Sequence, residues 1–264
     1  MATCQPHREG GECMETWMVV VLGAMVAGFV QGLSGSSFGL VSMSFWVWVL
    51  EPRLAATLAV FGSLFGQMLA AASMRRGFHW PQLLPFVLGG LAGIPLGVWL
   101  LPHLDMVWFK LILGVLLALW CPTMLFAKHL PRITRGGRLG DTLAGLGGGV
   151  MGGLGGFTGV VPTLWCTLRS FPKDTQRAVI QNFNLSMLLV TMATYLASGL
   201  VTREALPWFA VVAPAVLLPA LLGMRLYHRI SEARFRQIVL GLLTLSGLAM
   251  LSAALPPLLR QWLA

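Results

Sequence analysis

Long apolar segments separated by short polar loops make up most of the chain. Six of them carry at most one charged side chain over a length that can cross a bilayer core, which takes about 20 residues. These predicted membrane spans are residues 54–74, 81–101, 107–127, 178–202, 205–224 and 237–259. Because a continuous helix satisfies its own backbone groups in lipid, the pattern predicts an all-α integral membrane protein.

Two further apolar segments, 16–50 and 142–168, are interrupted by residues that break helices. The first contains AGFVQGLSGSSFG and the second contains GGGVMGGLGG. The two arms expected in the first segment, 17–32 and 38–50, would reach roughly 24 and 20 Å at about 1.5 Å per residue. Neither arm comfortably crosses a hydrocarbon core of about 30 Å. Each segment is therefore predicted to be a re-entrant hairpin that dips into the membrane and returns.

The second half of the sequence repeats landmarks of the first half in the same order. Each glycine-rich motif is followed by a short proline-containing loop, EPRLAA or FPKDTQ. A Phe followed by a basic residue comes later in each series, at Phe109 and again at Phe235. This self-similarity predicts a duplicated half with three full spans after each hairpin. The predicted organisation is an N-terminal tail 1–16, a first membrane repeat 17–127, a basic linker 128–139, a second membrane repeat 140–258 and a C-terminal tail 259–264.

The arginines and lysines distinguish between two orientations of the halves. If each broken segment crossed the membrane, the halves would be parallel and the 18 basic residues would divide nine and nine between the two faces. If each segment is re-entrant, the halves are inverted and thirteen basic residues lie opposite five. Cytoplasmic loops carry an excess of Lys and Arg. The sequence therefore predicts inverted halves, with the basic linker in the cytoplasm and the N-terminus outside. The smaller group is Arg8, Arg53, Lys110, Arg203 and Arg260.

Composition agrees with a membrane protein and limits the other classes. The chain is 56% hydrophobic and 10% charged, with a mean hydropathy of +0.78, whereas a soluble domain is about 25% charged. The net charge of +9 lies in loops beside apolar spans, so we interpret it as a topology signal and predict no nucleic-acid partner. A disulfide between Cys4 and Cys13 and unpaired thiols both remain open. No cysteine or histidine spacing indicates a metal site, and no cofactor is predicted.

The hairpin tips carry the residues expected to bind a ligand. Irregular backbone at membrane depth is tolerated where it is buried in protein or lines a cavity, and transporters bind substrate near the midplane. The second arm of each hairpin begins with N–H groups that lack partners and form a site for an anion. Hydroxyl groups can cap these helices or bind the anion, and glycines allow the turn and close approach of a ligand. The hydroxyl residues are Ser34, Ser36, Ser37 and Thr158, and the glycines are Gly32, Gly35, Gly153, Gly155 and Gly156. The alternative is that the glycines only allow helices to pack closely.

The segment after the second hairpin adds an arginine and amides. Arg177, Gln181 and Asn184 share one helical face, and Asn182 lies one turn before Ser186. The guanidinium could steer an oxyanion toward the tips; alternatively, Arg177 lies at the interface and the amides tie helices together. In the first half the amides at depth are Gln31 and Gln67, and Gln67 is interpreted as structural. Asp141, at the edge of an apolar segment, is expected to cap a helix. No other carboxylate indicates a residue for proton coupling.

The doubled motifs GFVQGLSGSSFG and GLGGGVMGGLGG, each followed by a proline-containing loop, resemble those of the sulfite exporter TauE/SafE-type permease family. The resemblance covers roughly residues 17–255. It implies a permease of the bacterial inner membrane for sulfite, organosulfonates or related sulfur oxyanions, often exporting them. The first motif has SGSS where the family has a run richer in Gly or Phe, which bears on the particular substrate.

The sequence as a whole predicts a secondary carrier that exports its substrate and is not an enzyme. The carrier is expected to hold a small anion at the midplane between the two hairpin tips. A channel or a structural membrane subunit is the alternative. An intramembrane enzyme acting on lipids is less favoured, because no metal-binding or acid–base motif occurs at depth. The expected partners are the anion and the lipid bilayer, and the oligomeric state, including a homo-oligomer, stays open. The predicted binding residues are Gln31, Ser34, Gly35, Ser36, Ser37, Gly155, Gly156, Thr158, Arg177, Gln181, Asn182 and Asn184.

Overall fold

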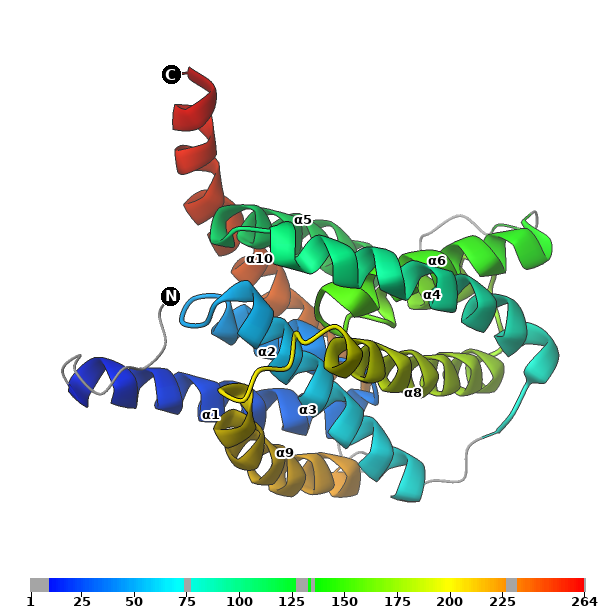
Figure 1. The fold of residues 1–264 in the computed structure, drawn as a ribbon. Coiled ribbons are helices and arrows are strands. Elements are labelled where there is room, and N and C mark those ends of the chain that lie inside the picture. Colours follow the sequence, from blue (N-terminus) through cyan, green and yellow to red (C-terminus); the bar gives the residue numbers. More distant parts are fainter. Residues whose placement is uncertain (1–9, 74–76, 127–132, 134–135, 227–231, 264) are drawn as a thin grey trace.

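The computed structural model describes residues 10–73, 77–126, 133, 136–226 and 232–263. Within these residues the chain forms ten α-helices, one short 3₁₀-helix at Leu101–His103 and no strand (Figure 1). Seven of the helices are long and apolar enough to cross a membrane. The predicted all-α membrane class is therefore confirmed. The proposed tail disulfide and most of the basic linker lie outside the described residues.

The helices follow the same order in the two halves of the chain. Each half has a long first helix, a helix of nine residues and then three long helices. The first half contains α1 (Gly10–Ser34), α2 (Phe38–Trp46), α3 (Pro52–Ser73), α4 (Trp80–Leu100) and α5 (Met106–Leu125). The second half contains α6 (Gly137–Gly155), α7 (Val160–Leu168), α8 (Lys173–Ala197), α9 (Ala205–Leu226) and α10 (Glu232–Leu263).

The first arm is longer than the sequence predicted. Helix α1 has 25 residues, about 37 Å at 1.5 Å per residue, so the expectation that neither arm could cross the bilayer is wrong for this arm. The predicted arm began just after the last charged residue of the N-terminal tail, although a helix can continue beyond the hydrocarbon core into water. Helix α2, with nine residues, reaches only about 14 Å. Helix α2 is therefore too short to cross a bilayer by itself.

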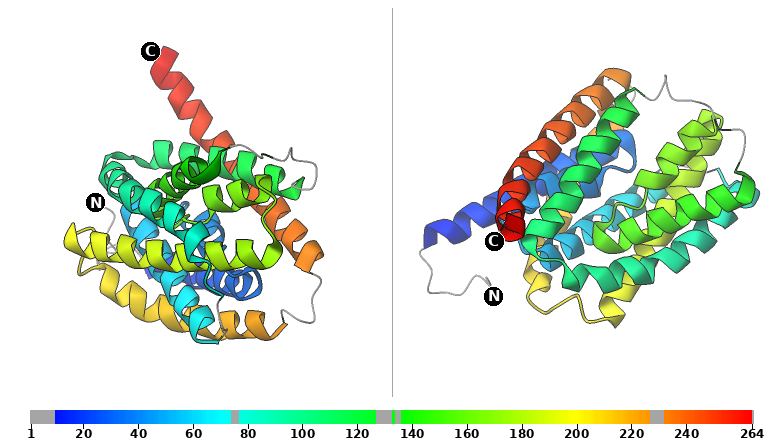
Figure 2. Two further views of the ribbon diagram at one scale, coloured as in Figure 1. Left: turned by 90° about the vertical axis from the view of Figure 1, so that its right-hand side faces the viewer. Right: turned by 90° about the horizontal axis from the view of Figure 1, so that it is seen from above.

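Helices of one half pack against helices of the other half in an exchanged pattern. Helix α1 packs on α9, and its counterpart α6 packs on α4. The third helices, α3 and α8, are in contact, as are the fifth helices, α5 and α10. Figure 2 shows α10 beside α5 along one side of the bundle, with the C-terminal end of α10 projecting beyond it. Corresponding helices of the two halves thus have corresponding neighbours.

Glycines allow the closest of these contacts. A Cβ atom on Gly145 or Gly149 of α6 would collide with the backbone of α4, at Phe86 and Gly90 respectively. In the other half, a Cβ on Gly32 would collide with the carbonyl of Ala220 on α9. Gly32 and Gly153 were expected to form the turns, but both lie inside helices and serve packing instead. The packing interpretation of the glycine-rich motifs is therefore correct for part of each motif.

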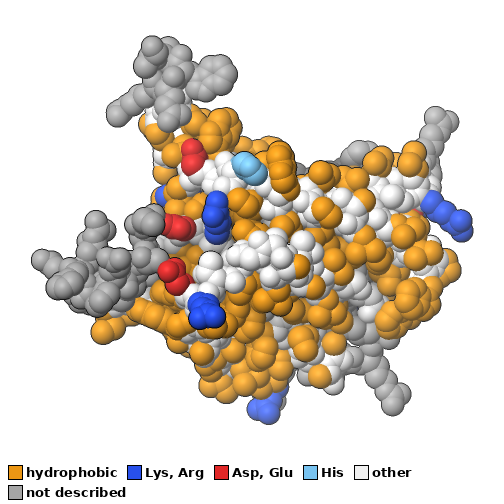
Figure 3. All heavy atoms as spheres, in the orientation of Figure 1, with side chains coloured by type: hydrophobic (Ala, Val, Ile, Leu, Met, Phe, Trp, Pro, Cys, Tyr) orange, Lys and Arg blue, Asp and Glu red, His pale blue; other side chains and the backbone are white. Residues whose placement is uncertain are grey.

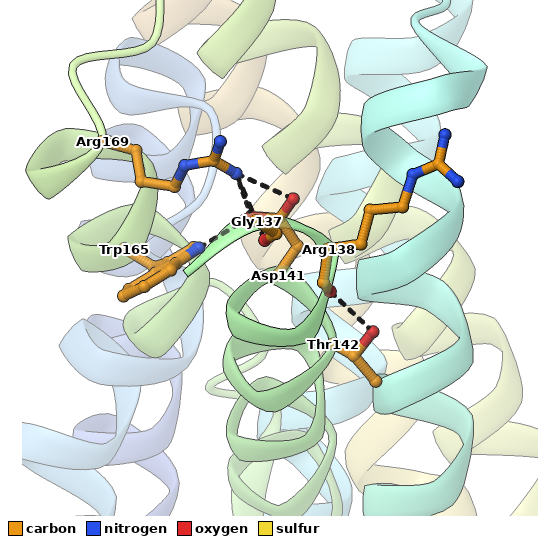
Figure 4. A network of polar contacts seen from close by, with 6 residues as sticks. All are labelled: Gly137, Arg138, Asp141, Thr142, Trp165 and Arg169. Atoms are coloured by element: carbon orange, nitrogen blue, oxygen red, sulfur yellow. Dashed lines mark hydrogen bonds and ion pairs between the residues drawn. The ribbon is translucent and has the colours of Figure 1, made fainter. Parts of the chain in front are cut away.

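Asp141 has a different role from the one that the sequence suggested. Gly136 occupies the N-cap position of α6, and Asp141 lies inside the helix with 5% of its surface exposed. Its carboxylate accepts hydrogen bonds from Arg169 at 2.7 Å and from the indole N–H of Trp165 at 2.8 Å (Figure 4). Arg169 also approaches the carbonyl of Gly137 at 3.5 Å. The beginning of α6 and the end of α7 are thus held together at one end of the molecule.

The surface has the character expected of a protein embedded in lipid. Hydrophobic side chains cover most of the face seen in Figure 3, where Asp and Glu gather at one end. Large apolar side chains are exposed along the spans, including Leu119 at 67% and Leu218 at 72%. Such a surface would be unfavourable in water and is favourable against acyl chains.

The glycine contacts between α4 and α6 predict a selective effect on stability. Gly149→Ala should destabilise the purified protein by about 1–3 kcal/mol, because the added methyl group overpacks the interface against the backbone of Gly90. Gly241→Ala is the control, since a Cβ at Gly241 on α10 meets nothing within 4 Å. Thermal unfolding measures both. Equal melting temperatures for the two variants would contradict the packing role.

Candidate functional site

The first helix break lies between α1 and α2. Gly35 adopts a left-handed conformation, with φ of 83°, and its N–H donates to the carbonyl of Gln31 at 2.7 Å. This geometry is a common way to end a helix, and it favours glycine over residues with a Cβ. The side-chain amide of Gln67, on α3, donates to the Gly35 carbonyl at 2.6 Å. The structural role predicted for Gln67 is thus confirmed, because it holds the turn.

The second break, between α6 and α7, has the same backbone geometry. Gly156 has φ of 77°, and its N–H donates to the carbonyl of Gly152 at 2.8 Å. Pro162 is the third residue of α7, within the first turn, where a missing N–H costs nothing. Thr158 does not cap α7, whose N-cap is Gly159. Its hydroxyl donates instead to the side-chain oxygen of Asn184 on α8 at 2.8 Å.

The two breaks lie against each other and against the opposite half. A Cβ on Gly39, at the start of α2, would be 3.2 Å from the carbonyl oxygen of Gly156. A Cβ on Gly156 would be 3.3 Å from the Cα of Val60 on α3. A Cβ on Gly35 would be 3.3 Å from the side-chain nitrogen of Gln181 on α8. Each break therefore packs on the third helix of the other half.

A cavity of about 180 Å³ lies beside the breaks. Both breaks line it, through Ser34, Ser36 and Ser37 in the first and Gly156 in the second. The fifth helices supply another wall, which includes Trp120 and Met124 on α5 and Phe235, Val239, Leu240 and Leu243 on α10. No charged side chain is among the described residues that line this cavity. No group of three His, Cys, Asp or Glu side chains able to hold a metal ion lies in the described part of the chain.

The structure brings together part of the predicted binding set. Ser34, Ser36, Ser37 and Gly156 line the cavity. Gly35 lies in the first turn beside it, whereas Gly155, which was expected in the second turn, is the last residue of α6. Ser37 occupies the N-cap position of α2, but its side chain makes no capping hydrogen bond. The Ser34 hydroxyl donates to the carbonyl of Val30 at 2.8 Å.

The predicted amides and arginine lie outside the cavity lining. Gln31 is 3% exposed and donates to the carbonyl of Ser63 at 3.0 Å, which ties α1 to α3. Asn182 donates to the carbonyl of Gly77 at 3.0 Å, and Asn184 bonds to Thr158. Arg177 is exposed near the start of α8. A role for Arg177 and Gln181 in attracting the anion stays a prediction.

Sequence reasoning missed the apolar wall of the cavity. Trp120 is fixed by a hydrogen bond from its indole N–H to the carbonyl of Val160 at 3.0 Å. Phe235 packs edge-to-face on Phe29 of α1, with ring centroids 6.2 Å apart. An apolar residue within a membrane span looks the same in sequence whether it faces lipid, another helix or a cavity. No sequence signal therefore marked these residues.

A second, much smaller cavity, of about 10 Å³, also has Phe157 in its lining. It is entirely apolar and includes Phe109, Leu113, Met151 and Leu154 in its lining. Phe157 lines both cavities and is only 5% exposed. Its ring also lies against the backbone of the breaks, since a Cβ on Gly155 would come within 2.8 Å of it. Phe157 is thus the residue that the described linings of the two cavities share.

The comparison with protein families agrees with this architecture. The model of the family described as sulfite exporter TauE/SafE matches residues 20–250, which is most of the chain. No curated protein and no solved structure gives a significant match. The matched region begins in α1 and ends in α10, so it includes both helix breaks and the cavity between them. The chain belongs to the sulfite exporter TauE/SafE family, a family of membrane transporters.

Proposed function

We propose that this protein is a secondary carrier that binds a small sulfur-containing anion between its two helix breaks and exports it. Membership of the family supports transport of sulfur anions across a membrane. The observation that carries the proposal is the cavity of about 180 Å³ lined by both breaks. Irregular backbone inside a bilayer needs such a protein-lined space, and transporters of several folds bind substrate beside broken helices.

Hydrogen-bond donors at the first break would hold the anion. The first N–H groups of α2 have no partner within the helix, and the helix dipole gives that end a partial positive charge. Ser34 already donates its hydroxyl hydrogen to Val30, so Ser36 and Ser37 are the better candidates as side-chain donors. An oxyanion of sulfur offers several acceptor oxygens to this arrangement.

A contact at one end of the molecule supports the re-entrant topology of the second broken segment. There the contacts of Arg169 join the end of α7 to the start of α6. In the proposed orientation this end is cytoplasmic, because it carries most of the basic residues. At the opposite end, Arg53 donates to the carbonyl of Pro102 at 3.0 Å and the Lys110 ammonium lies 4.7 Å from the centre of the Trp48 ring, contacts that either topology allows.

The position of the cavity suggests an inward-facing conformation. Met124 is next to the last residue of α5, and Phe235 lies in the first turn of α10. The chain continues from the end of α5 into the basic linker that we propose to be cytoplasmic, and α10 packs on α5. Phe157 and the apolar residues beyond it would form the barrier toward the outside. Alternating access would require the hairpins to move relative to α5 and α10, so that this barrier opens as the inner side closes.

The proposed site predicts anion-dependent stabilisation of the purified protein. Sulfite, thiosulfate, sulfate, taurine and sulfoacetate would be screened by thermal shift, and at least one should raise the melting temperature. Replacing both Ser36 and Ser37 by Ala should weaken binding about tenfold or more, because each lost hydrogen bond to a charged group is worth about 1.5–3 kcal/mol. Ser252→Ala, on the exposed side of α10, is the control. If no sulfur anion stabilises the wild-type protein, the proposed function fails.

The barrier role predicts a transport phenotype for Phe157. In proteoliposomes, Phe157→Ala should abolish the transient overshoot of labelled substrate in counterflow, because an opened barrier converts the carrier into a leak. Phe86→Ala is the control, since Phe86 is equally buried but lines neither cavity. Phe157→Leu keeps most of the volume and should retain part of the overshoot. A normal overshoot in Phe157→Ala would contradict the barrier role, and the absence of an overshoot in the wild type would favour a channel.

A further inference from the structure

We infer that the cavity selects sulfur oxyanions carrying an apolar substituent, such as short alkyl or aromatic sulfonates, over inorganic sulfite and over sulfonates with a charged tail. This inference rests on the proposed function, because it concerns the anion that would occupy the same cavity. Its basis is the two-sided chemistry of the lining. One side has serine hydroxyls and the other is a wall of apolar side chains.

The cavity is larger than an inorganic oxyanion requires. A single water needs roughly 10–15 Å³ of such space, and the cavity measures about 180 Å³. An ion of four or five heavy atoms would fill only part of it and would need water to occupy the remainder. A sulfonate with an alkyl or phenyl group would fill the space and displace that water from the apolar wall.

The wall is apolar and fixed in place. The indole N–H of Trp120 is already bonded to the carbonyl of Val160, so this side chain presents its ring surface rather than a donor. Phe235 is held against Phe29 of α1. Leu240 and Leu243 are 6% and 4% exposed. Methionine at position 124 adds a side chain that adapts to the shape of an apolar partner. Such a wall favours burial of a substituent from water.

The absence of charge among the described lining residues argues against more highly charged or polar ligands. A doubly charged oxyanion would lose hydration against the wall, and none of the described lining side chains carries a charge that would compensate it. An ammonium or carboxylate at the far end of a sulfonate would meet the same wall. Asn182 and Asn184, which could have bonded to such a group, bond to Gly77 and Thr158 instead. A monoanion with an apolar tail satisfies both sides of the cavity.

A series of ligands with one head group tests the inference on the full-length purified protein. Dissociation constants would be measured for methane-, ethane-, butane- and benzenesulfonate, alongside sulfite, taurine and sulfoacetate. We expect affinity to rise about fourfold for each added methylene up to butanesulfonate, and taurine and sulfoacetate to bind more weakly than ethanesulfonate.

A matched pair of double variants on α10 tests whether the cavity wall causes the rise of affinity with chain length. Replacing Leu240 and Leu243 by Ala should flatten the chain-length series, so that butanesulfonate gains little affinity over methanesulfonate. Replacing Leu242 and Leu245, which are 61% and 64% exposed, should leave the series unchanged. Thermal unfolding of both double variants without ligand reports whether each is folded.

The outcomes distinguish a failure of this inference from a failure of the proposed function on which it rests. If sulfite or methanesulfonate binds but longer sulfonates bind no better in the wild type, the apolar selection is wrong and the carrier proposal survives. If none of the anions binds, the proposed function fails and this inference fails with it. A rising series that the Leu240/Leu243 variant does not flatten would show that the wall is not the selecting element.

Discussion

The cost of leaving backbone groups unpaired in hydrocarbon governs this structure. A helix interrupted within a bilayer exposes N–H and C=O groups that lipid cannot bond, so the break has to be enclosed by protein or open onto a polar space. This chain has two breaks, at Gly35 and Gly156, and encloses each with the third helix of the opposite half. The helices leave open a cavity beside the two breaks, which is where we propose that the anion binds.

Glycine has two separate functions in the motifs that identify the family. Gly35 and Gly156 adopt left-handed conformations that end the first arms. Gly32, Gly145, Gly149 and Gly153 instead allow the backbones of neighbouring helices to come into contact. The close packing fixes α1 on α9 and α6 on α4, which holds the two breaks against each other. Packing of the helices by one set of glycines is therefore compatible with the binding that we propose at the breaks.

The sequence predicted the helices well because hydrocarbon imposes a strict limit on charge and length. Spans predicted at 81–101 and 205–224 correspond to α4 (Trp80–Leu100) and α9 (Ala205–Leu226). The glycine and serine motifs also predicted both breaks. The length of α1 was underestimated, because a helix does not stop at the membrane surface where the charges begin. Asp141 was misassigned as a cap because its partner, Arg169, is brought to it only by the return of α7.

The candidate site was less predictable than the fold. Ser34, Ser36 and Ser37 were recognisable because hydroxyl groups are conspicuous in an apolar segment, and the structure places them around the cavity. Asn182 and Asn184 were equally conspicuous, but they bond to Gly77 and Thr158. The contribution of Trp120, Phe235 and Leu240 had no sequence signal, since it depends on which face of α5 and α10 turns inward. Polar residues in apolar segments can be recognised from the sequence, but the packing of the helices determines which of them line the cavity.

Cysteine accessibility from the two sides of the membrane tests the central claim most directly. In a chain whose native cysteines are replaced, single cysteines would be placed at Glu15 and Glu51, which flank the first hairpin, and at Arg138 and Lys173, which flank the second; all four positions are exposed. Two returning hairpins predict that an impermeant thiol reagent modifies Glu15→Cys and Glu51→Cys from one side, and Arg138→Cys and Lys173→Cys from the other. Modification of the two members of either pair from opposite sides would mean that the broken segment crosses the membrane, and the account would be wrong.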